Sequence, residues 1–257
     1  MTLNKLAEHN VGYRAWPEQL DPRRHTIVMI HGAGGRTEIW NGQLRHLGAQ
    51  FNAVAIDLPG HGATPGNGFN AISDYATWLV DILDACFDAP VVLMGHSMGG
   101  AICQQATLQG SERIKALVLV GTGPRLKVAP AFLEGLKKNF EPTVDLIIKY
   151  AYSSSAQPLM ISQGADLMKQ AGPEVLYNDF AACDAFDVRD RIGKVELPTL
   201  VICGKEDKLT PPSLCRKLNE SIRNSKMIEI PGAGHMVMIE AWRPFNEAVI
   251  DFVKGLP

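Results

Sequence analysis

Residues 91–101 have the sequence Val91-Val92-Leu93-Met94-Gly95-His96-Ser97-Met98-Gly99-Gly100-Ala101, an apolar run followed by a serine between glycines. The apolar run begins after Pro90 and ends at Gly95, so it is too short for a helix and is typical of a buried strand. The last part matches the pattern G-x-S-x-G, in which a tight turn from strand to helix exposes a serine hydroxyl above a sheet. The sequence therefore predicts a strand, a sharp turn and a helix, with Ser97 as the candidate nucleophile.

A pentapeptide of this form also occurs by chance in ordinary turns, so the surrounding segments decide its meaning. Short apolar runs alternate with segments of helical spacing on both sides of Ser97, and the runs that we expect to be strands are residues 11–16, 26–30, 52–56, 114–120, 199–203 and 226–230. Strand, helix and strand at this spacing form βαβ units. The sequence predicts an α/β fold with a mostly parallel central sheet flanked by helices.

The alternation of strand and helix is interrupted between residues 124 and 188. This segment contains helix-like stretches at residues 131–139, 144–150, 159–170 and 174–182, separated by prolines, and no convincing strand. Open α/β sheets bind ligands beyond the carboxyl ends of their strands. We therefore expect a core domain of residues 1–123 and 189–257 and a helical cap, or lid, of residues 124–188 over that edge. Additional packing without a lid role is the alternative.

Composition narrows the class of protein. The 257 residues are 46% hydrophobic and 20% charged, which is ordinary for a globular chain and argues against disorder. A formal net charge of −2 provides no basic surface for a nucleic acid or an anionic membrane, so neither partner is expected. Five unpatterned cysteines, no apolar leader and no long apolar run favour a cytoplasmic protein without a metal site.

An acid and a histidine follow Ser97 in loops that come directly after predicted strands. Asp207 ends the sequence Gly204-Lys205-Glu206-Asp207, and His235 ends Gly232-Ala233-Gly234-His235. Histidine can accept the proton of a serine hydroxyl and donate it to a leaving group, while a carboxylate on its far nitrogen fixes the tautomer. We expect Ser97 to be the nucleophile, His235 the general acid and base, and Asp207 the orienting acid. Glu206 competes with Asp207 for that role.

Cleavage of an acyl group also needs donors for the oxyanion that forms. The amide of Met98, directly after the candidate nucleophile, is one expected donor. The loop His31-Gly32-Ala33-Gly34-Gly35 offers the second donor through the amide of Ala33, because its glycines allow the backbone to approach closely.

These segments together resemble the α/β-hydrolase fold superfamily, particularly its small lidded esterases, lactonases, carbon–carbon bond hydrolases and haloperoxidase-like enzymes. The matching sequences are His31-Gly32-Ala33-Gly34-Gly35 with Trp40 beyond it, Asp57-Leu58-Pro59-Gly60-His61-Gly62, Gly95-His96-Ser97-Met98-Gly99-Gly100, Gly204-Lys205-Glu206-Asp207 and Gly232-Ala233-Gly234-His235. The resemblance implies a hydrolase without cofactor or metal, with the triad acid at Asp207. It places Gly32, Gly34 and Trp40 near a substrate, and Ser97 in place of an acid argues against dehalogenases and epoxide hydrolases.

Three functions follow in order of preference. The first is a serine hydrolase that cleaves a small carboxylic ester, lactone or thioester through an acyl-enzyme, with a small-molecule substrate as its partner. The second is hydrolysis of a carbon–carbon bond in a vinylogous diketone acid, whose acid group would need a basic residue, and the candidates are Arg125, Lys127, Arg189 and Arg191. The third is a ligand-sensing protein that keeps the fold with negligible turnover. We expect structural roles for His31, His61 and His96.

Overall fold

The central sheet has the order β1-β3-β2-β4-β5-β6-β7 in a computed structural model that describes residues 2–257. The strands are β1 (Tyr13–Trp16), β2 (Thr26–Ile30), β3 (Asn52–Ile56), β4 (Val91–His96), β5 (Ile114–Val120), β6 (Thr199–Gly204) and β7 (Ser225–Ile230). Every neighbouring pair is parallel except β1 and β3, which are antiparallel at one edge. The predicted α/β fold with a mostly parallel sheet is confirmed.

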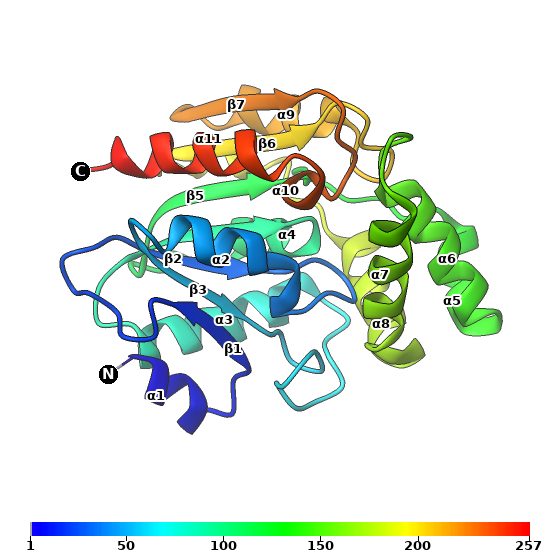
Figure 1. Cartoon of the computed structure of the whole chain (residues 1–257), viewed down its shortest axis with the longest axis horizontal. Helices are drawn as coiled ribbons and strands as arrows, with labels where there is room; N and C mark the ends of the chain where they lie inside the picture. Colours follow the sequence, from blue (N-terminus) through cyan, green and yellow to red (C-terminus); the bar gives the residue numbers. More distant parts are fainter. Residues whose placement is uncertain (1) are drawn as a thin grey trace.

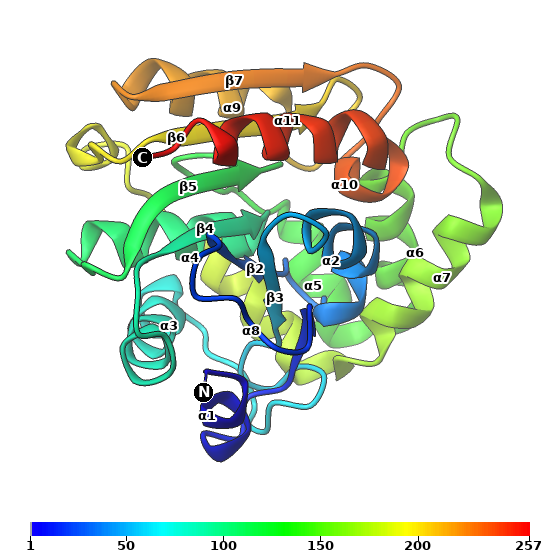
Figure 2. The same ribbon diagram turned by 60° about the vertical axis from the view of Figure 1, so that its left-hand side comes forward.

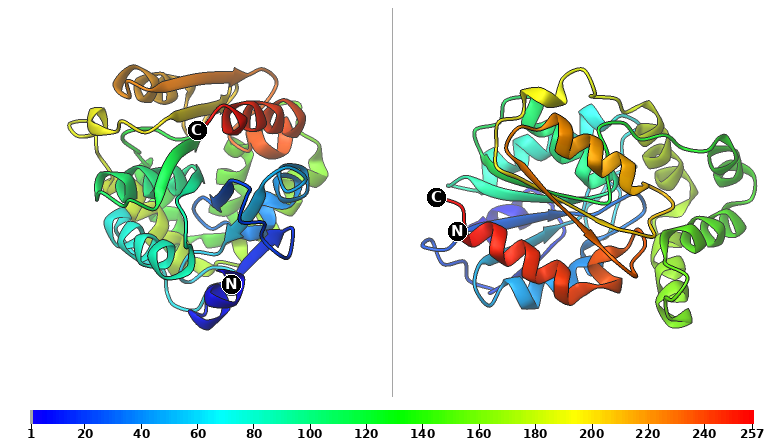
Figure 3. Two further views of the ribbon diagram at one scale, coloured as in Figure 1. Left: turned by 90° about the vertical axis from the view of Figure 1, so that its left-hand side faces the viewer. Right: turned by 90° about the horizontal axis from the view of Figure 1, so that it is seen from above.

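Helices cover both faces of this sheet (Figure 2). One layer contains α1 (Thr2–Glu8), α3 (Ile72–Cys86), α4 (Met98–Leu108) and α9 (Pro212–Ser221), and the other contains α2 (Asn41–Leu47) and α11 (Trp242–Lys254). Successive side chains of a strand point to opposite faces, so Leu93 packs toward the first layer and Met94 toward the second. Figure 3 shows α9 and α11 on opposite sides of the sheet.

Four further helices lie together beyond the carboxyl ends of the strands (Figure 1). They are α5 (Pro130–Lys138), α6 (Phe140–Ala151), α7 (Pro158–Lys169) and α8 (Gly172–Ala185), and we call them the four-helix segment. They share an apolar cluster of their own, which includes Leu136, Ile147 and Leu176. The expected helices are present, but Pro142 lies inside the first turn of α6 rather than between helices, a position where the missing N–H costs nothing.

Some short elements have no clear signal in the sequence. These are α1, the 3-10 turns η1 (Thr37–Trp40) and η2 (Ile192–Lys194), and α10 (Val237–Glu240). Helices this short are held by packing rather than by propensity, as the fully buried Leu6 of α1 illustrates. Within residues 2–257, no helix is both long and apolar enough to cross a membrane.

Candidate active site

Ser97 occupies a strained turn between β4 and α4. Its backbone has φ 53° and ψ −116°, a conformation that costs free energy for any residue other than glycine. Neighbouring groups hold it there, because the Ser97 N–H donates to the Val120 carbonyl at 2.9 Å and the Ser97 carbonyl accepts from the Thr122 hydroxyl at 2.9 Å. The predicted strand, sharp turn and helix are therefore present, with the serine at the strained position.

Two glycines around Ser97 allow α4 to begin close to the sheet. A Cβ atom on Gly95 would lie 2.3 Å from the Gly99 carbonyl oxygen, and one on Gly99 would lie 2.5 Å from the His31 carbonyl oxygen. No larger residue fits either position without displacing backbone. Met98 is the first residue of α4, so its N–H has no acceptor within the helix and is available to an anion at Ser97.

His235 and Asp207 form the expected pair. The Nδ1 atom of His235 lies 2.8 Å from Oδ2 of Asp207, and the other carboxylate oxygen accepts hydrogen bonds from the amides of Leu209 at 2.9 Å and Thr210 at 2.8 Å. Burial opposes ionisation of Asp207, but His235 and these donors hold its pKa below the ordinary value. The competing acid Glu206 lies elsewhere, with its carboxylate 3.2 Å from the Ser154 hydroxyl.

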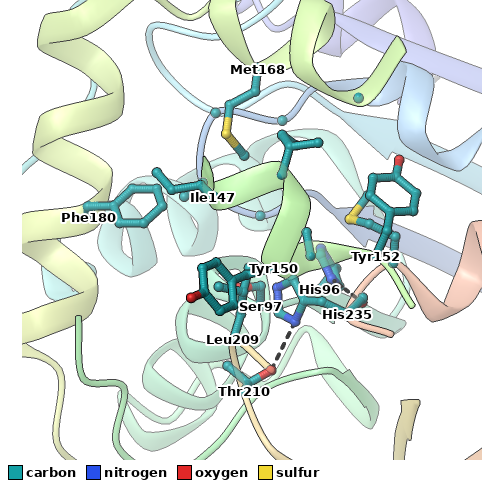
Figure 4. A pocket seen from close by; sticks show the side chains of 18 of the residues that line it. His96, Ser97, Ile147, Tyr150, Tyr152, Met168, Phe180, Leu209, Thr210 and His235 are labelled. Atoms are coloured by element: carbon teal, nitrogen blue, oxygen red, sulfur yellow. Dashed lines mark hydrogen bonds between the residues drawn. The ribbon is translucent and has the colours of Figure 1, made fainter. Parts of the chain in front are cut away.

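Thr210 is a member of this cluster that the sequence did not reveal. Its hydroxyl oxygen lies 2.8 Å from Oδ2 of Asp207, 3.0 Å from Nδ1 of His235 and 2.7 Å from the Gly121 carbonyl oxygen. The dashed line in Figure 4 marks its contact with His235. The one weak signal is its spacing, because an aspartate often bonds amides two or three residues further on. Thr210 fixes the position of the carboxylate that faces the imidazole.

His96, directly before Ser97, supports the loop that carries His235. Its Nε2 atom lies 3.0 Å from the His235 carbonyl oxygen, and the two rings are 4.5 Å apart between centroids. Burial, together with the neighbouring His235 ring, lowers the pKa of His96 to about 3. The His96 imidazole is therefore neutral at neutral pH and donates from Nε2, in agreement with the structural role expected for it.

The loop at residues 31–35 lies beside Ser97, since a Cβ atom on Gly32 would be 3.1 Å from the Ser97 Cβ. The Gly32 carbonyl accepts from the Gly35 amide at 3.0 Å and faces Nδ1 of His31 at 2.8 Å, so the turn is bonded on its inner side. The Ala33 N–H makes no hydrogen bond with any described residue. Gly34 has φ +61°, a backbone conformation that favours glycine, and a Cβ atom there would also have to displace the end of the Leu176 side chain, 2.6 Å away.

A cavity of about 760 Å³ lies between this loop and the four-helix segment, with Ser97 and His235 in its wall. Figure 4 shows the Ser97 and His235 side chains next to each other, facing the apolar side chains above them. Most of the lining is apolar. It comes from the four-helix segment and from Tyr152 directly after α6, and the helices contribute Phe132, Leu146, Ile147, Tyr150, Met160, Leu167, Met168 and Phe180. The cavity therefore suits an apolar group held next to the serine.

The structure brings most of the predicted site residues together. Gly32, Ala33, Gly34, Ser97 and His235 line the cavity, while Met98 and Asp207 lie buried directly behind it. Trp40 differs from the expectation, because its side chain is fully buried in the core with β2, β3 and α11 and does not line the cavity. Trp40 is the last residue of η1, and η1 and α2 pack against this face of the sheet, so the indole ring lies in the core.

The four basic residues considered for an acidic substrate are all engaged with partners. Arg125 and Arg189 share Asp187, at 3.6 Å and 2.6 Å, and Lys127 pairs with Asp184 at 2.9 Å. Arg191 bonds the Gln105 side chain at 3.2 Å. Of these cations only Lys127 lines the cavity. The geometry therefore does not favour the carbon–carbon bond hydrolase.

Comparison with known proteins agrees with this arrangement. The α/β hydrolase fold family matches residues 25–241. The pimeloyl-[acyl-carrier protein] methyl ester esterase of Chromobacterium violaceum is 28% identical over 245 residues, which cover 90% of this chain and 92% of that protein. A solved thermophilic esterase is 36% identical with a TM-score of 0.83, covering 96% of this chain and 95% of that one. The enol-lactonase of Burkholderia xenovorans LB400 is 22% identical, has a TM-score of 0.87 and covers 95% of this chain and 96% of its own.

The chain belongs to the α/β hydrolase fold family, as its motifs indicated. Within that family it is an enzyme of the carboxylic ester hydrolase type.

Proposed function

We propose that the protein hydrolyses a small carboxylic ester with an apolar acyl group, through an acyl-enzyme on Ser97. The observation that carries the proposal is the hydrogen bond between Nδ1 of His235 and Oδ2 of Asp207 at 2.8 Å, which leaves Nε2 of the same ring for Ser97 on the cavity wall. A lactone or a thioester would use the same groups.

In the first step, Nε2 of His235 accepts the Ser97 proton while Oγ attacks the ester carbonyl carbon. The Asp207 carboxylate stabilises the imidazolium that forms, and its low pKa keeps it charged. The carbonyl oxygen becomes an oxyanion, which accepts hydrogen bonds from the amides of Met98 and Ala33. One such donor typically contributes about 3–4 kcal/mol to the stability of the transition state.

In the second step, the tetrahedral intermediate collapses and the bond to the leaving alkoxide breaks. His235 returns its proton to that oxygen, so the alcohol leaves and the acyl group stays on Ser97 as an ester. A water molecule then attacks the acyl carbon while His235 again accepts a proton. The same two amides stabilise the second oxyanion. When it collapses, the bond between the acyl carbon and Oγ of Ser97 breaks, His235 donates its proton to Oγ, and the carboxylic acid departs.

The four-helix segment is proposed to be the lid over this reaction and to select the acyl group. Its helices contribute the aromatic and aliphatic side chains that face Ser97 across the cavity. The Chromobacterium violaceum relative is named as a pimeloyl-[acyl-carrier protein] methyl ester esterase, which supports an ester substrate in general. A small-molecule ester as partner, a cytoplasmic location and the absence of a cofactor stay predictions from the sequence.

The test is steady-state hydrolysis of p-nitrophenyl esters from acetate to decanoate. We expect turnover by the wild type, a loss of nearly all activity in Ser97→Ala, and a loss of about 10⁴-fold in kcat for Asp207→Asn, because the wrong histidine tautomer results. Glu206→Gln is the matched control, since it removes the neighbouring acid and should leave kcat within about twofold. Equal losses in Asp207→Asn and Glu206→Gln, or activity in Ser97→Ala, would overturn the assignment.

A ligand-sensing protein with negligible turnover predicts a different outcome from the same assay. It predicts no hydrolysis at any chain length, together with slow labelling of Ser97 by a fluorophosphonate. Fast labelling that disappears in Ser97→Ala indicates an activated nucleophile, so the combination of labelling and turnover separates the two functions.

A further inference from the structure

We propose that Asp179, on α8 of the four-helix segment, is a positioning residue for the loop that carries the Ala33 oxyanion donor. Its carboxylate is fully buried and accepts hydrogen bonds from three donors of the core, the Tyr75 hydroxyl at 2.7 Å, the Gly34 amide at 2.8 Å and Nε2 of His61 at 2.9 Å. Asp179 and Gly34 are 145 residues apart in the sequence. The inference rests on the proposed ester hydrolysis and adds a residue that none of the motifs contains.

The partners of His61 show that Asp179 faces a cation. Nε2 of His61 faces the Asp179 carboxylate at 2.9 Å, and Nδ1 faces the Pro59 carbonyl oxygen at 3.1 Å. Both neighbours are acceptors, so both ring nitrogens carry a proton. Burial opposes this charge, but Asp179, the Pro59 carbonyl and Asp57 together raise the pKa of His61 above its ordinary value.

The neighbouring histidine, His31, is uncharged, so the positive charge stays on His61. Nε2 of His31 accepts from the Leu58 amide at 3.0 Å, and Nδ1 donates to the Gly32 carbonyl at 2.8 Å. His31 is thus a neutral ring, and burial with the charge of His61 holds its pKa well below the ordinary value. The two rings lie 4.8 Å apart, so only one of them can carry the positive charge that Asp179 requires.

Asp179 completes the restraint on the peptide groups that flank Ala33. On one side, the Gly32 carbonyl belongs to the same peptide unit as the Ala33 N–H, and it is held by the His31 ring and the Gly35 amide. On the other side, the Gly34 N–H belongs to the next peptide unit, and its acceptor is Asp179. With both units fixed, the Ala33 N–H has a single direction. A charged acceptor gives the stronger hydrogen bond for this purpose.

The Tyr75 hydroxyl donates to Oδ1 of Asp179, while the Gly34 amide and His61 face Oδ2, so both oxygens of the carboxylate are engaged. Burial and the Asp179 charge raise the pKa of Tyr75, so its hydroxyl keeps the proton that it donates to Oδ1. Tyr75 belongs to α3 and is itself fully buried. The Asp179 carboxylate is therefore hydrogen-bonded to helix α3, to the loop after β3 and to the loop after β2. These three contacts together fix its position relative to Ser97.

The variant Asp179→Asn tests the proposal, because it keeps the shape of the side chain and removes its charge. We expect kcat on the preferred p-nitrophenyl ester to fall by about 10- to 100-fold, with KM within about twofold, since only the oxyanion contact is weakened. A trifluoromethyl ketone, which adds to Ser97 as a tetrahedral oxyanion, should lose affinity by a similar factor. Glu174→Gln, an exposed acid on the same helix, is the matched control and should change neither quantity.

Amide hydrogen exchange provides a readout that does not depend on turnover. In Asp179→Asn the peptide that contains residues 31–36 should exchange faster than in the wild type, and in Glu174→Gln it should not. Unchanged exchange, or a change in KM alone, would overturn the positioning role. If wild-type protein hydrolyses no ester but this exchange pattern holds, the proposed function fails and the structural inference stands.

Tyr75→Phe covers the case in which Asp179→Asn does not fold. It removes one of the three donors and leaves the charge pair with His61 intact. We expect a fall in kcat of about 2- to 10-fold at constant KM, with faster exchange over residues 31–36. Full wild-type kcat and exchange in this folded variant would contradict the proposal.

Discussion

The carbonyl oxygen of His235 accepts a hydrogen bond from Nε2 of His96 at 3.0 Å, so the residue before the candidate nucleophile holds the backbone of the candidate base. The two segments are 139 residues apart in the sequence. Because His96 and Ser97 are adjacent, a shift of either loop changes the distance between the serine hydroxyl and the imidazole. This contact makes His96, which also lines the cavity, part of the alignment of the site.

Replacement of this histidine should therefore affect both stability and rate. In His96→Ala the buried carbonyl of His235 loses its donor, which typically costs about 1–3 kcal/mol in the free energy of unfolding. We expect kcat to fall by about tenfold or more because the base is misplaced. Urea denaturation and steady-state kinetics measure the two effects. His9→Ala, at an exposed histidine, is the control, and an equal response in both variants would refute the argument.

The buried histidines predict a stability maximum near neutral pH. In the folded chain the pKa values of His31 and His96 are lowered, so the unfolded chain binds more protons below pH of about 6.5 and stability falls as the pH falls. The pKa of His61 is raised, so its contribution is present below pH of about 6.5 and is lost as the pH rises through its folded value.

Urea midpoints measured from pH 4 to pH 9 test this dependence. On the acidic limb of the profile, the free energy of unfolding should fall as the pH falls, with a slope that corresponds to up to about two protons. On the alkaline limb it should fall as the pH rises, with a slope that corresponds to up to about one proton. Asp179→Asn removes the charge that holds the His61 proton and should flatten the alkaline limb, while an acidic limb persists because His31 and His96 stay buried. A flat profile in the wild type, or loss of the acidic limb in this variant, is the contrary result.

Chain-length preference should respond to the aromatic side chains of the cavity. Phe180 lies in the lining opposite Ser97, so Phe180→Ala enlarges the space for the acyl group. We expect the highest kcat/KM in a p-nitrophenyl ester series to move toward longer chains. Leu159→Ala is the control, because Leu159 is 64% exposed and does not line the cavity. The same optimum in both variants would show that the acyl group binds elsewhere.

Two glycines give a matched pair of backbone substitutions. Gly34 has φ +61°, so Gly34→Ala should destabilise the chain by about 1–2 kcal/mol or more and lower kcat, because the new Cβ strains the turn beside Ala33. Gly42 lies in α2 with open space around it, so Gly42→Ala should raise the free energy of unfolding by about 0.5–1 kcal/mol at unchanged kcat. Thermal unfolding and kinetics of both variants check the signs, and a stabilising effect of Gly34→Ala would contradict them.

The centre of the sheet could be predicted from the sequence because its inner strands are mostly apolar, with Lys115 of β5 as an exception. The strands β2, β3 and β5 begin and end where their apolar runs do, since parallel strands are buried on both faces. The helix α1 could not, because it has few apolar residues and is held by the packing of Leu6. Trp40 was expected near the substrate, and only the packing of η1 and α2 against the sheet shows that it belongs to the core.

Some residues of the site could be predicted from local sequence motifs, whereas others are recognised only from contacts in the folded chain. Ser97, Asp207 and His235 follow strands within motifs whose spacing is visible in the sequence, and the structure brings Asp207 and His235 into contact. Thr210 and Asp179 act through contacts that depend on the folded loops. Nothing in the helical pattern of α8 distinguishes Asp179 from the exposed Glu174, because burial by the opposing loops decides between them.

The carboxylate of α8 limits how this enzyme can be re-engineered. Exchange of residues 124–188 for the corresponding segment of another hydrolase is an obvious route to a new specificity, since most of the apolar lining comes from there. Such a chimera would leave the His61 imidazolium and the Gly34 amide buried without their acceptor. A transplanted segment needs an acid at the place of Asp179, or a compensating change of His61 to an uncharged residue, before its new pocket can be used.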